Sequence, residues 1–292
     1  MTVSNAINIL CTIFLLSITN YSLFGQKLEP KNRIPESDHT ITSNILERDY
    51  QLYISLPFSY SANDTISYPV LYVLDGMRDF NLFYQQNKFL WYRGGIEEVI
   101  IVGIAAGKNR GYDYSPTPNI DTTAVRKIEK DRDLPAGTIK SGGAAKFLEV
   151  IKTEINPFID TMYKTNTNRG ISGHSLGGLF TAYCLLNSDG FFTRFGINSP
   201  SFWWNDGEFL EKGILQFAEN KTWDIPPTKV FLSVGGKESS RILPGTIKFS
   251  SSLQDAKYEN IKLSWNIFED ETHGSVIPVS LRHTIIELYG KK

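Results

Sequence analysis

One serine lies between glycines in the run Gly-Ile-Ser-Gly-His-Ser-Leu-Gly-Gly, which spans residues 170–178. Residues 169–172, ahead of Ser175, predict a short strand, and the apolar residues 177–186 predict a helix after the serine. A sharp turn between strand and helix holds Ser175 in a strained conformation with its hydroxyl projecting from the top of a sheet. Gly173 and Gly177 are expected to prevent side chains from colliding across this turn. The context therefore indicates an exposed nucleophile rather than a plain glycine-rich turn.

Composition limits what such a chain can form. The chain has 292 residues, of which 41% are hydrophobic, and its formal net charge is −1. A chain of this size can bury one large core, so a single α/β domain is expected. Short basic stretches such as 126–132 alternate with acids and read as solvated surface, which argues against a nucleic-acid partner.

The N-terminus has the pattern of a secretory signal peptide. Residues 7–18 are almost wholly apolar, and small residues near Gly25 offer a cleavage point, although no Lys or Arg precedes the run. The run is too short to span a bilayer, so no stable membrane insertion is expected after cleavage. We predict a signal peptide over 1–25, a single domain over 26–292, and export to the periplasm or the medium. A membrane anchor or an unstructured terminus is the alternative.

Cysteine usage agrees with this organisation. Cys11 lies inside the apolar run, so Cys184 stands alone once the signal is removed. A single cysteine cannot form an internal disulfide, and we expect Cys184 to be a small buried side chain.

The rest of the chain alternates between strand and helix patterns, which predicts an α/β fold with a mostly parallel central sheet and helices on both faces. Residues 107–140 have no clear period and are expected to form a loop at the rim of the site. Strands are expected at 48–56, 68–74, 99–104, 191–197, 229–234 and 261–267, and helices at 81–92, 144–163 and 276–289.

A serine hydroxyl needs a base at neutral pH, and the chain has only four histidines. His39 lies in a polar N-terminal extension, and His174 is expected to point away from the serine. His283 lies inside the last predicted helix. His273 follows the strand that ends at 267 and precedes that helix, where the order Ser, acid, His places the catalytic histidine. We predict His273 as the base.

The acid that orients the histidine is expected at the end of a strand between the serine and His273. Glu238 fits best, because the strand 229–234 ends in Gly-Gly-Lys-Glu. Asp255 itself is expected to be helical, and the acids at 269–271 are too close to His273 in sequence to approach it from a neighbouring strand. An exposed loop acid is the alternative for Glu238.

An oxyanion formed at an acyl carbon needs two backbone donors. The residue after the nucleophile, Leu176, supplies one. The buried strand that ends at Leu74 is followed by Asp75 and Gly76, so the Met77 amide is the candidate for the second. An ordinary Asp-Gly turn is the alternative.

Four segments together resemble the enterochelin esterase/antigen 85-related esterase family of the α/β-hydrolase superfamily. The resemblance covers roughly residues 51–288. It implies a serine esterase without a metal or cofactor, with Ser175, Glu238 and His273 as triad and Met77 and Leu176 as oxyanion donors. The segments are Leu-Asp-Gly at 74–76, Gly-His-Ser-Leu-Gly-Gly at 173–178, Ser-Pro-Ser-Phe-Trp-Trp at 199–204 and Thr-His-Gly-Ser-Val at 272–276.

Substrates of the similar family include siderophore trilactones, feruloyl and acetyl esters of plant polysaccharides, and glutathione thioesters. The cysteine-containing oxyanion segment typical of S-formylglutathione hydrolases is absent from this sequence. Arg110 is a candidate for binding a catecholate, with a rim salt bridge as the alternative. Trp203 and Trp204 are candidates for packing on a sugar or aryl group, or else for packing a cap. Tyr112 and Tyr114 are expected at the substrate rim.

These features predict a carboxylic-ester hydrolase that acts through an acyl-enzyme on a small-molecule or oligosaccharide ester, with a siderophore or a polysaccharide acyl ester as the substrate. An acyltransferase would use the same triad with an alcohol acceptor, and a non-catalytic binding protein would keep only the fold. The sequence leaves the acyl group, the leaving group and the oligomeric state open.

Overall fold

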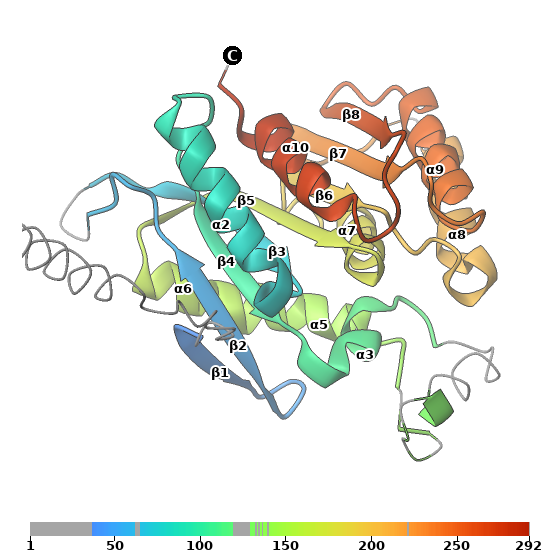
Figure 1. Cartoon of the computed structure of the whole chain (residues 1–292), viewed down its shortest axis with the longest axis horizontal. Coiled ribbons are helices and arrows are strands. Elements are labelled where there is room, and N and C mark those ends of the chain that lie inside the picture. Colours follow the sequence, from blue (N-terminus) through green and yellow to red (C-terminus); the bar gives the residue numbers. More distant parts are fainter. Residues whose placement is uncertain are drawn as a thin grey trace, which may run out of the picture. The chain divides into compact units, whose positions relative to one another are not determined.

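Eight strands form one central sheet in this computed structural model (Figure 1). The structure describes residues 37–61, 65–118, 129–131, 133, 135, 137–138, 140–220 and 222–291. The predicted signal peptide at 1–25 lies outside these residues. The strands are β1 (His39–Ser43), β2 (Arg48–Ser55), β3 (Tyr68–Leu74), β4 (Ile100–Ala105), β5 (Thr165–His174), β6 (Arg194–Asn198), β7 (Thr228–Gly235) and β8 (Ile261–Phe268).

The strand order β1-β2-β4-β3-β5-β6-β7-β8 makes the sheet mostly parallel. Only β1 and β2 pair antiparallel to their neighbours, and the six strands from β4 to β8 in the sheet are parallel. Because these six strands run in the same direction, their carboxyl ends lie along one edge of the sheet. The loops after β3, β5, β6 and β7 therefore meet there.

Helices cover both faces, as predicted. In Figure 1, α2 (Gly76–Tyr92) and α10 (Ile277–Tyr289) lie side by side on one face. Their apolar side chains pack with one set of strand residues, and the helices of the other face pack with the alternate set. All seven residues of β3 are buried, which explains its continuous apolar sequence. Further helices in the described part of the chain are α3 (Arg110–Tyr114), α5 (Ala144–Val150), α6 (Asn156–Met162), α7 (Leu176–Asn187), α8 (Glu208–Glu219) and α9 (Leu243–Asp255).

The predicted helix over 144–163 is one continuous helical segment with a change of pitch. Between α5 and α6, residues Ile151–Ile155 form a π-helical turn. The turn comes just before Pro157, which lacks the N–H for an intrahelical bond and whose ring crowds the preceding turn. A wider π turn accommodates such a residue without ending the helix.

Several sequence predictions need correction. The helix expected at 81–92 begins at Gly76, because an Asp75 in the left-handed region allows the chain to turn directly from β3 into α2. His39 belongs to the edge strand β1 rather than to an extension. The loop expected over 107–140 contains α3 and a short 3-10 turn, Gly107–Asn109, and residues 119–128 lie outside the described part.

None of the helices in the described part of the chain has the length and apolar character that crossing a bilayer requires. Cys184 is fully buried on α7, as expected for a small core side chain, and burial raises the pKa of its thiol well above the usual value.

The close approach of α2 to β4 generates a prediction about stability. A Cβ atom at Gly76 would lie 2.6 Å from the carbonyl carbon of Gly103 and 2.7 Å from the amide nitrogen of Ile104. Both are backbone atoms that cannot rotate away. We therefore expect Gly76→Ala to lower the free energy of unfolding by about 1–3 kcal/mol, as overpacked sites do. Urea denaturation measures this loss.

Gly95→Ala is the matched control, because a Cβ there would meet only the Leu90 carbonyl oxygen, at 3.6 Å. Equal stability of the two variants would contradict the steric explanation.

Candidate active site

The turn at Ser175 connects β5 directly to α7. Ser175 has φ 62° and ψ −119°, an unfavourable conformation for a residue with a side chain. A Cβ at Gly173 would lie 2.5 Å from the carbonyl carbon of Gly177, so glycine is required there as predicted. At Gly177 a Cβ would make only ordinary contacts, and that part of the prediction is wrong. The second required glycine is Gly178, where a Cβ would lie 2.5 Å from the Asn198 oxygen.

His273 lies between Ser175 and Glu238. Its Nε2 is 3.0 Å from Ser175 Oγ, and its Nδ1 is 2.6 Å from Glu238 Oε2. The Glu238 side chain is fully buried, whereas 40% of the His273 side chain is exposed. The loops after β5, β7 and β8 thus bring together the three residues that the sequence nominates, in a continuous chain of hydrogen-bonding contacts.

Three donors surround the Glu238 carboxylate. Besides His273, the Ser199 hydroxyl donates to Oε1 over 2.5 Å and the Gly235 amide donates to the same oxygen over 2.9 Å. Burial, the largest influence, acts to raise the pKa of Glu238, but these hydrogen bonds together outweigh it and leave the pKa below its usual value. Glu238 is therefore ionised at neutral pH.

The rival acids lie elsewhere. Asp270 forms an exposed ion pair with Lys237, and Asp255 is the last residue of α9. Among the other histidines, His39 bonds to the Tyr163 hydroxyl and His283 packs against Phe268.

His174 makes a contact that the sequence did not predict. The residue is 2% exposed, and its ring lies against the His273 ring with a centroid distance of 4.5 Å. Neither ring nitrogen has a hydrogen-bond partner of good geometry among the described residues. Burial, with the nearby His273, Arg78 and Arg110, lowers the pKa of His174 to about 3. A neutral imidazole therefore supports the ring of His273.

The two predicted oxyanion donors lie in the first turns of the helices that follow the adjacent strands β5 and β3. Leu176 is the first residue of α7 and Met77 the second of α2. First-turn amides lack intrahelical acceptors and lie at the positive end of the helix dipole. Because β3 and β5 are adjacent, the loop after β3 lies against the serine turn, with Asp75 Oδ2 3.6 Å from where a Gly177 Cβ would be.

Arg110 is ion-paired, as its alternative interpretation proposed. Its Nε and Nη2 lie 2.7 and 2.9 Å from the two carboxylate oxygens of Asp75, and Nη2 also donates to the His174 carbonyl over 3.2 Å. Tyr114 is fully buried, and its hydroxyl accepts a hydrogen bond from the Asp75 amide. The expectation of Tyr114 at the substrate rim is therefore wrong, because α3 turns this ring into the core.

The remaining candidates differ in exposure. Trp203 is 38% exposed, whereas Trp204 is 7% exposed and donates from Nε1 to the Thr117 carbonyl. Trp204 thus joins the loop after β6 to the segment after α3. Tyr112 is half-buried, lies against Gly143 and has the Arg48 guanidinium 5.5 Å from its ring centre.

Sequence reasoning missed the serines of the loop after β6 as site residues. Ser199 touches Glu238, and Ser201 Oγ lies 3.3 Å from Ser175 Oγ. Their position immediately after a predicted strand, within the Ser-Pro-Ser-Phe-Trp-Trp segment, was the available signal.

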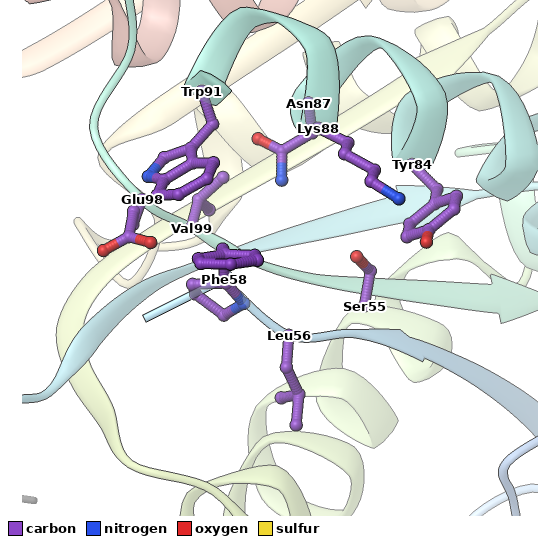
Figure 2. A pocket seen from close by; sticks show the side chains of 10 residues that line it. Ser55, Leu56, Phe58, Tyr84, Asn87, Lys88, Trp91, Glu98 and Val99 are labelled. Atoms are coloured by element: carbon purple, nitrogen blue, oxygen red, sulfur yellow. The ribbon is translucent and has the colours of Figure 1, made fainter. Parts of the chain in front are cut away.

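A separate groove of about 160 Å³ lies between α2 and the segment after β2 (Figure 2). Figure 2 shows the Phe58 ring beneath Trp91, with the Asn87 amide directed into the groove. Ser55 at its wall pairs with Ile101, near the start of β4, so the groove lies at the opposite edge of the sheet from the serine. Within the described ranges, no group of three His, Cys, Asp or Glu side chains is arranged to hold a metal ion.

Comparisons with known proteins show which family and fold the chain shares. The chain is 29% identical over 241 residues to the ferri-bacillibactin esterase BesA of Bacillus subtilis, covering 80% of this chain and 82% of that protein. It is 24% identical over 258 residues to the apo-salmochelin esterase of Escherichia coli, covering 84% and 76%. The crystal structure of the BES protein from Bacillus cereus superimposes with a TM-score of 0.72 at 29% identity, covering 89% and 98%.

The fold is that of the α/β-hydrolases, as predicted. The family model described as "Putative esterase" matches residues 43–268, most of the chain. The chain therefore belongs to this esterase family and is a carboxylic-ester hydrolase.

Proposed function

We propose that the protein cleaves its ester through an acyl-enzyme on Ser175, with His273 as general base and acid and Glu238 as the orienting carboxylate. The observation that carries this proposal is the chain of contacts Ser175–His273–Glu238, at 3.0 and 2.6 Å. A serine next to a base that a buried carboxylate holds in turn is the arrangement that activates a hydroxyl.

Acylation begins with neutral His273, whose Nδ1–H donates to Glu238 and whose Nε2 accepts the Ser175 proton. Ser175 Oγ attacks the acyl carbon, and the carbonyl oxygen becomes an oxyanion. Leu176 and Met77 are the proposed amide donors to that oxyanion, and each stabilises charge that develops only during the reaction. The His273 imidazolium then protonates the leaving alcohol as the bond between the acyl carbon and that oxygen breaks.

Deacylation repeats these steps with water. His273 Nε2 accepts a proton from the water as the water oxygen attacks the acyl carbon. The same two amides then donate hydrogen bonds to the second oxyanion. The bond to Ser175 Oγ breaks, His273 returns the proton to Ser175, and the acid leaves. The exposed edge of His273 provides access for the water.

A siderophore ester is the substrate class that we propose, because relatives are named as a ferri-bacillibactin esterase, an apo-salmochelin esterase and a siderophore enterobactin esterase. Trp203, which is exposed two residues after Ser201, is the proposed contact for an aromatic arm of such a substrate. Tyr112 is a further proposed contact at the rim. Arg110 and Trp204 are proposed to shape this rim rather than touch the substrate, since their polar groups are already engaged.

Export of the enzyme is a further part of the proposal. Its support is the apolar run at 7–18 followed by small residues.

The triad proposal makes a quantitative prediction. Ser175→Ala and His273→Ala are each expected to lower kcat/KM by at least about a thousandfold, because the members of a triad act as a unit. Glu238→Ala is expected to cost less. Hydrolysis of a catecholate trilactone, methyl ferulate and an acetylated xylo-oligosaccharide measures activity and substrate class together, and we expect the trilactone to be preferred.

Asp255→Ala is the matched control for the acid, since this carboxylate lies at the end of α9. A larger loss in folded Asp255→Ala than in Glu238→Ala would reject the assigned acid. Preference for one of the other two esters would reject the siderophore class while leaving the triad intact.

Recognition by Trp203 is tested with a variant pair. Trp203→Ala is expected to raise KM for an aromatic ester about tenfold, with a smaller effect on an acetate ester, because only the aromatic ester loses ring packing. Trp265 on β8 is 40% exposed, close to the 38% of Trp203, so Trp265→Ala controls for the loss of an exposed indole. Steady-state kinetics on both esters measures the effect, and equal changes in the two variants would remove Trp203 from the site.

His174 gives a prediction about pH. The pKa of His174 is about 3 in the folded chain, whereas a histidine in an unfolded chain titrates near 6.5. The unfolded chain therefore binds this proton first, so the contribution of neutral His174 to stability is present above about pH 6.5 and is lost as the pH falls toward 3. We expect urea denaturation of His174→Phe to show a shallower loss of stability across this window than wild type shows. Parallel curves would contradict the lowered pKa.

A further inference from the structure

One short loop touches both ends of the triad. The segment Ser199-Pro200-Ser201 follows β6, the strand that lies between β5 and β7 in the sheet. Ser199 Oγ donates to Glu238 Oε1 over 2.5 Å, and Ser201 Oγ lies 3.3 Å from Ser175 Oγ. The nucleophile therefore has two polar neighbours, His273 and Ser201.

The direction of the hydrogen bond between Ser201 and Ser175 follows from the proton positions on His273 and Ser175. Ionised Glu238 can only accept, so His273 Nδ1 carries the proton that lies between them. Neutral His273 then has a lone pair on Nε2, which accepts the Ser175 proton. Because the Ser175 proton is committed to His273, the contact between the two serines has Ser201 as donor and Ser175 Oγ as acceptor.

Backbone hydrogen bonds hold the Ser201 hydroxyl in this position. The Ser201 amide donates to the Ser175 carbonyl over 3.1 Å, and the Ser175 amide donates to the Asn198 carbonyl over 3.0 Å. The Ser199 amide donates to the Ser233 carbonyl on β7 over 2.7 Å. Ser199 and Ser201 are 0% and 1% exposed, so packing as well as hydrogen bonding restrains both side chains.

We propose that Ser201 is an auxiliary catalytic residue, whose hydroxyl stabilises charge on Ser175 Oγ when that oxygen attacks the ester and again when it leaves the acyl carbon. This inference rests on the proposed function. The Ser201 proton stays on Ser201 throughout, and His273 alone transfers a proton. A hydrogen bond to a charged oxygen is stronger than one to a hydroxyl or to an ester oxygen. Ser201 therefore favours both transition states over the ground states.

Ser201→Ala tests the proposal, with acylation and deacylation rates measured separately from the burst and steady state of p-nitrophenyl acetate hydrolysis. We expect each rate constant to fall about tenfold, which corresponds to about 1.4 kcal/mol. The KM for p-nitrophenyl acetate and the midpoint temperature of unfolding are expected to change little. Ser201→Thr keeps the hydroxyl and is expected to recover most of both rates.

Ser188→Ala is the matched control, because Ser188 is also 1% exposed and its Oγ has no hydrogen-bond partner in the described part of the chain. Unchanged rates in Ser201→Ala, or a loss that Ser201→Thr does not recover, would overturn the proposal. Ser175→Ala distinguishes a failure of the proposed function from a failure of the proposed role of Ser201. Full activity in that variant would overturn the proposed function, whereas an inactive Ser175→Ala beside a fully active Ser201→Ala would overturn the role of Ser201 alone.

Discussion

The strained turn at Ser175 is the constraint on which the site depends. Its backbone is kept in an unfavourable region by hydrogen bonds to the end of β6, where the Asn198 carbonyl accepts from the Ser175 amide and the Ser201 amide donates to the Ser175 carbonyl. Such strain costs on the order of 1–3 kcal/mol, which favourable interactions in the surrounding structure must offset. Two glycines, Gly173 and Gly178, make the approach possible. The turn thus fixes three features at once: the direction of the Ser175 hydroxyl, the start of α7 and the position of the Leu176 amide.

Beneath this turn, a buried side-chain amide ties the neighbouring elements together. Asn198 Oδ1 accepts from Ser233 on β7 over 2.7 Å and from Thr284 on α10 over 3.2 Å, while its Nδ2 donates to Ser172 on β5 over 3.2 Å. Buried polar groups that are satisfied in this way specify one arrangement, because any other leaves them unpaired in a medium of low polarity. The carboxyl ends of β5, β6 and β7 are thereby held in register, and these are the ends that supply Ser175, Ser201 and Glu238.

Sequence patterns predicted the parts of this structure that follow from local chemistry. The buried parallel strands, the turn at Ser175 and the encounter of Glu238 with His273 all follow from apolar runs ending in glycines or acids at one edge of a sheet. The patterns failed where long-range packing decides. The burial of Tyr114 depends on α3 folding over the core, and the contact between the tilted rings of His174 and His273 joins the end of β5 to the loop after β8, about a hundred residues later in the chain. The need for glycine at 178 rather than 177 depends on the path of the chain after β6, which no local pattern encodes.

Ion pairs between arginines and aspartates near the proposed oxyanion amides affect how the site can attract a substrate. Arg110 binds both oxygens of Asp75, and Arg78 binds Asp79 over 2.6 Å with a longer contact to Asp75. Two arginines and two aspartates cancel, so this cluster offers little net attraction to an anionic ligand. Its hydrogen bonds instead join the start of α2 to the His174 carbonyl, directly before the nucleophile. Under the proposed function, these ion pairs fix the start of α2, which carries the proposed Met77 donor, and the exposed indole of Trp203 is the proposed contact that selects among esters.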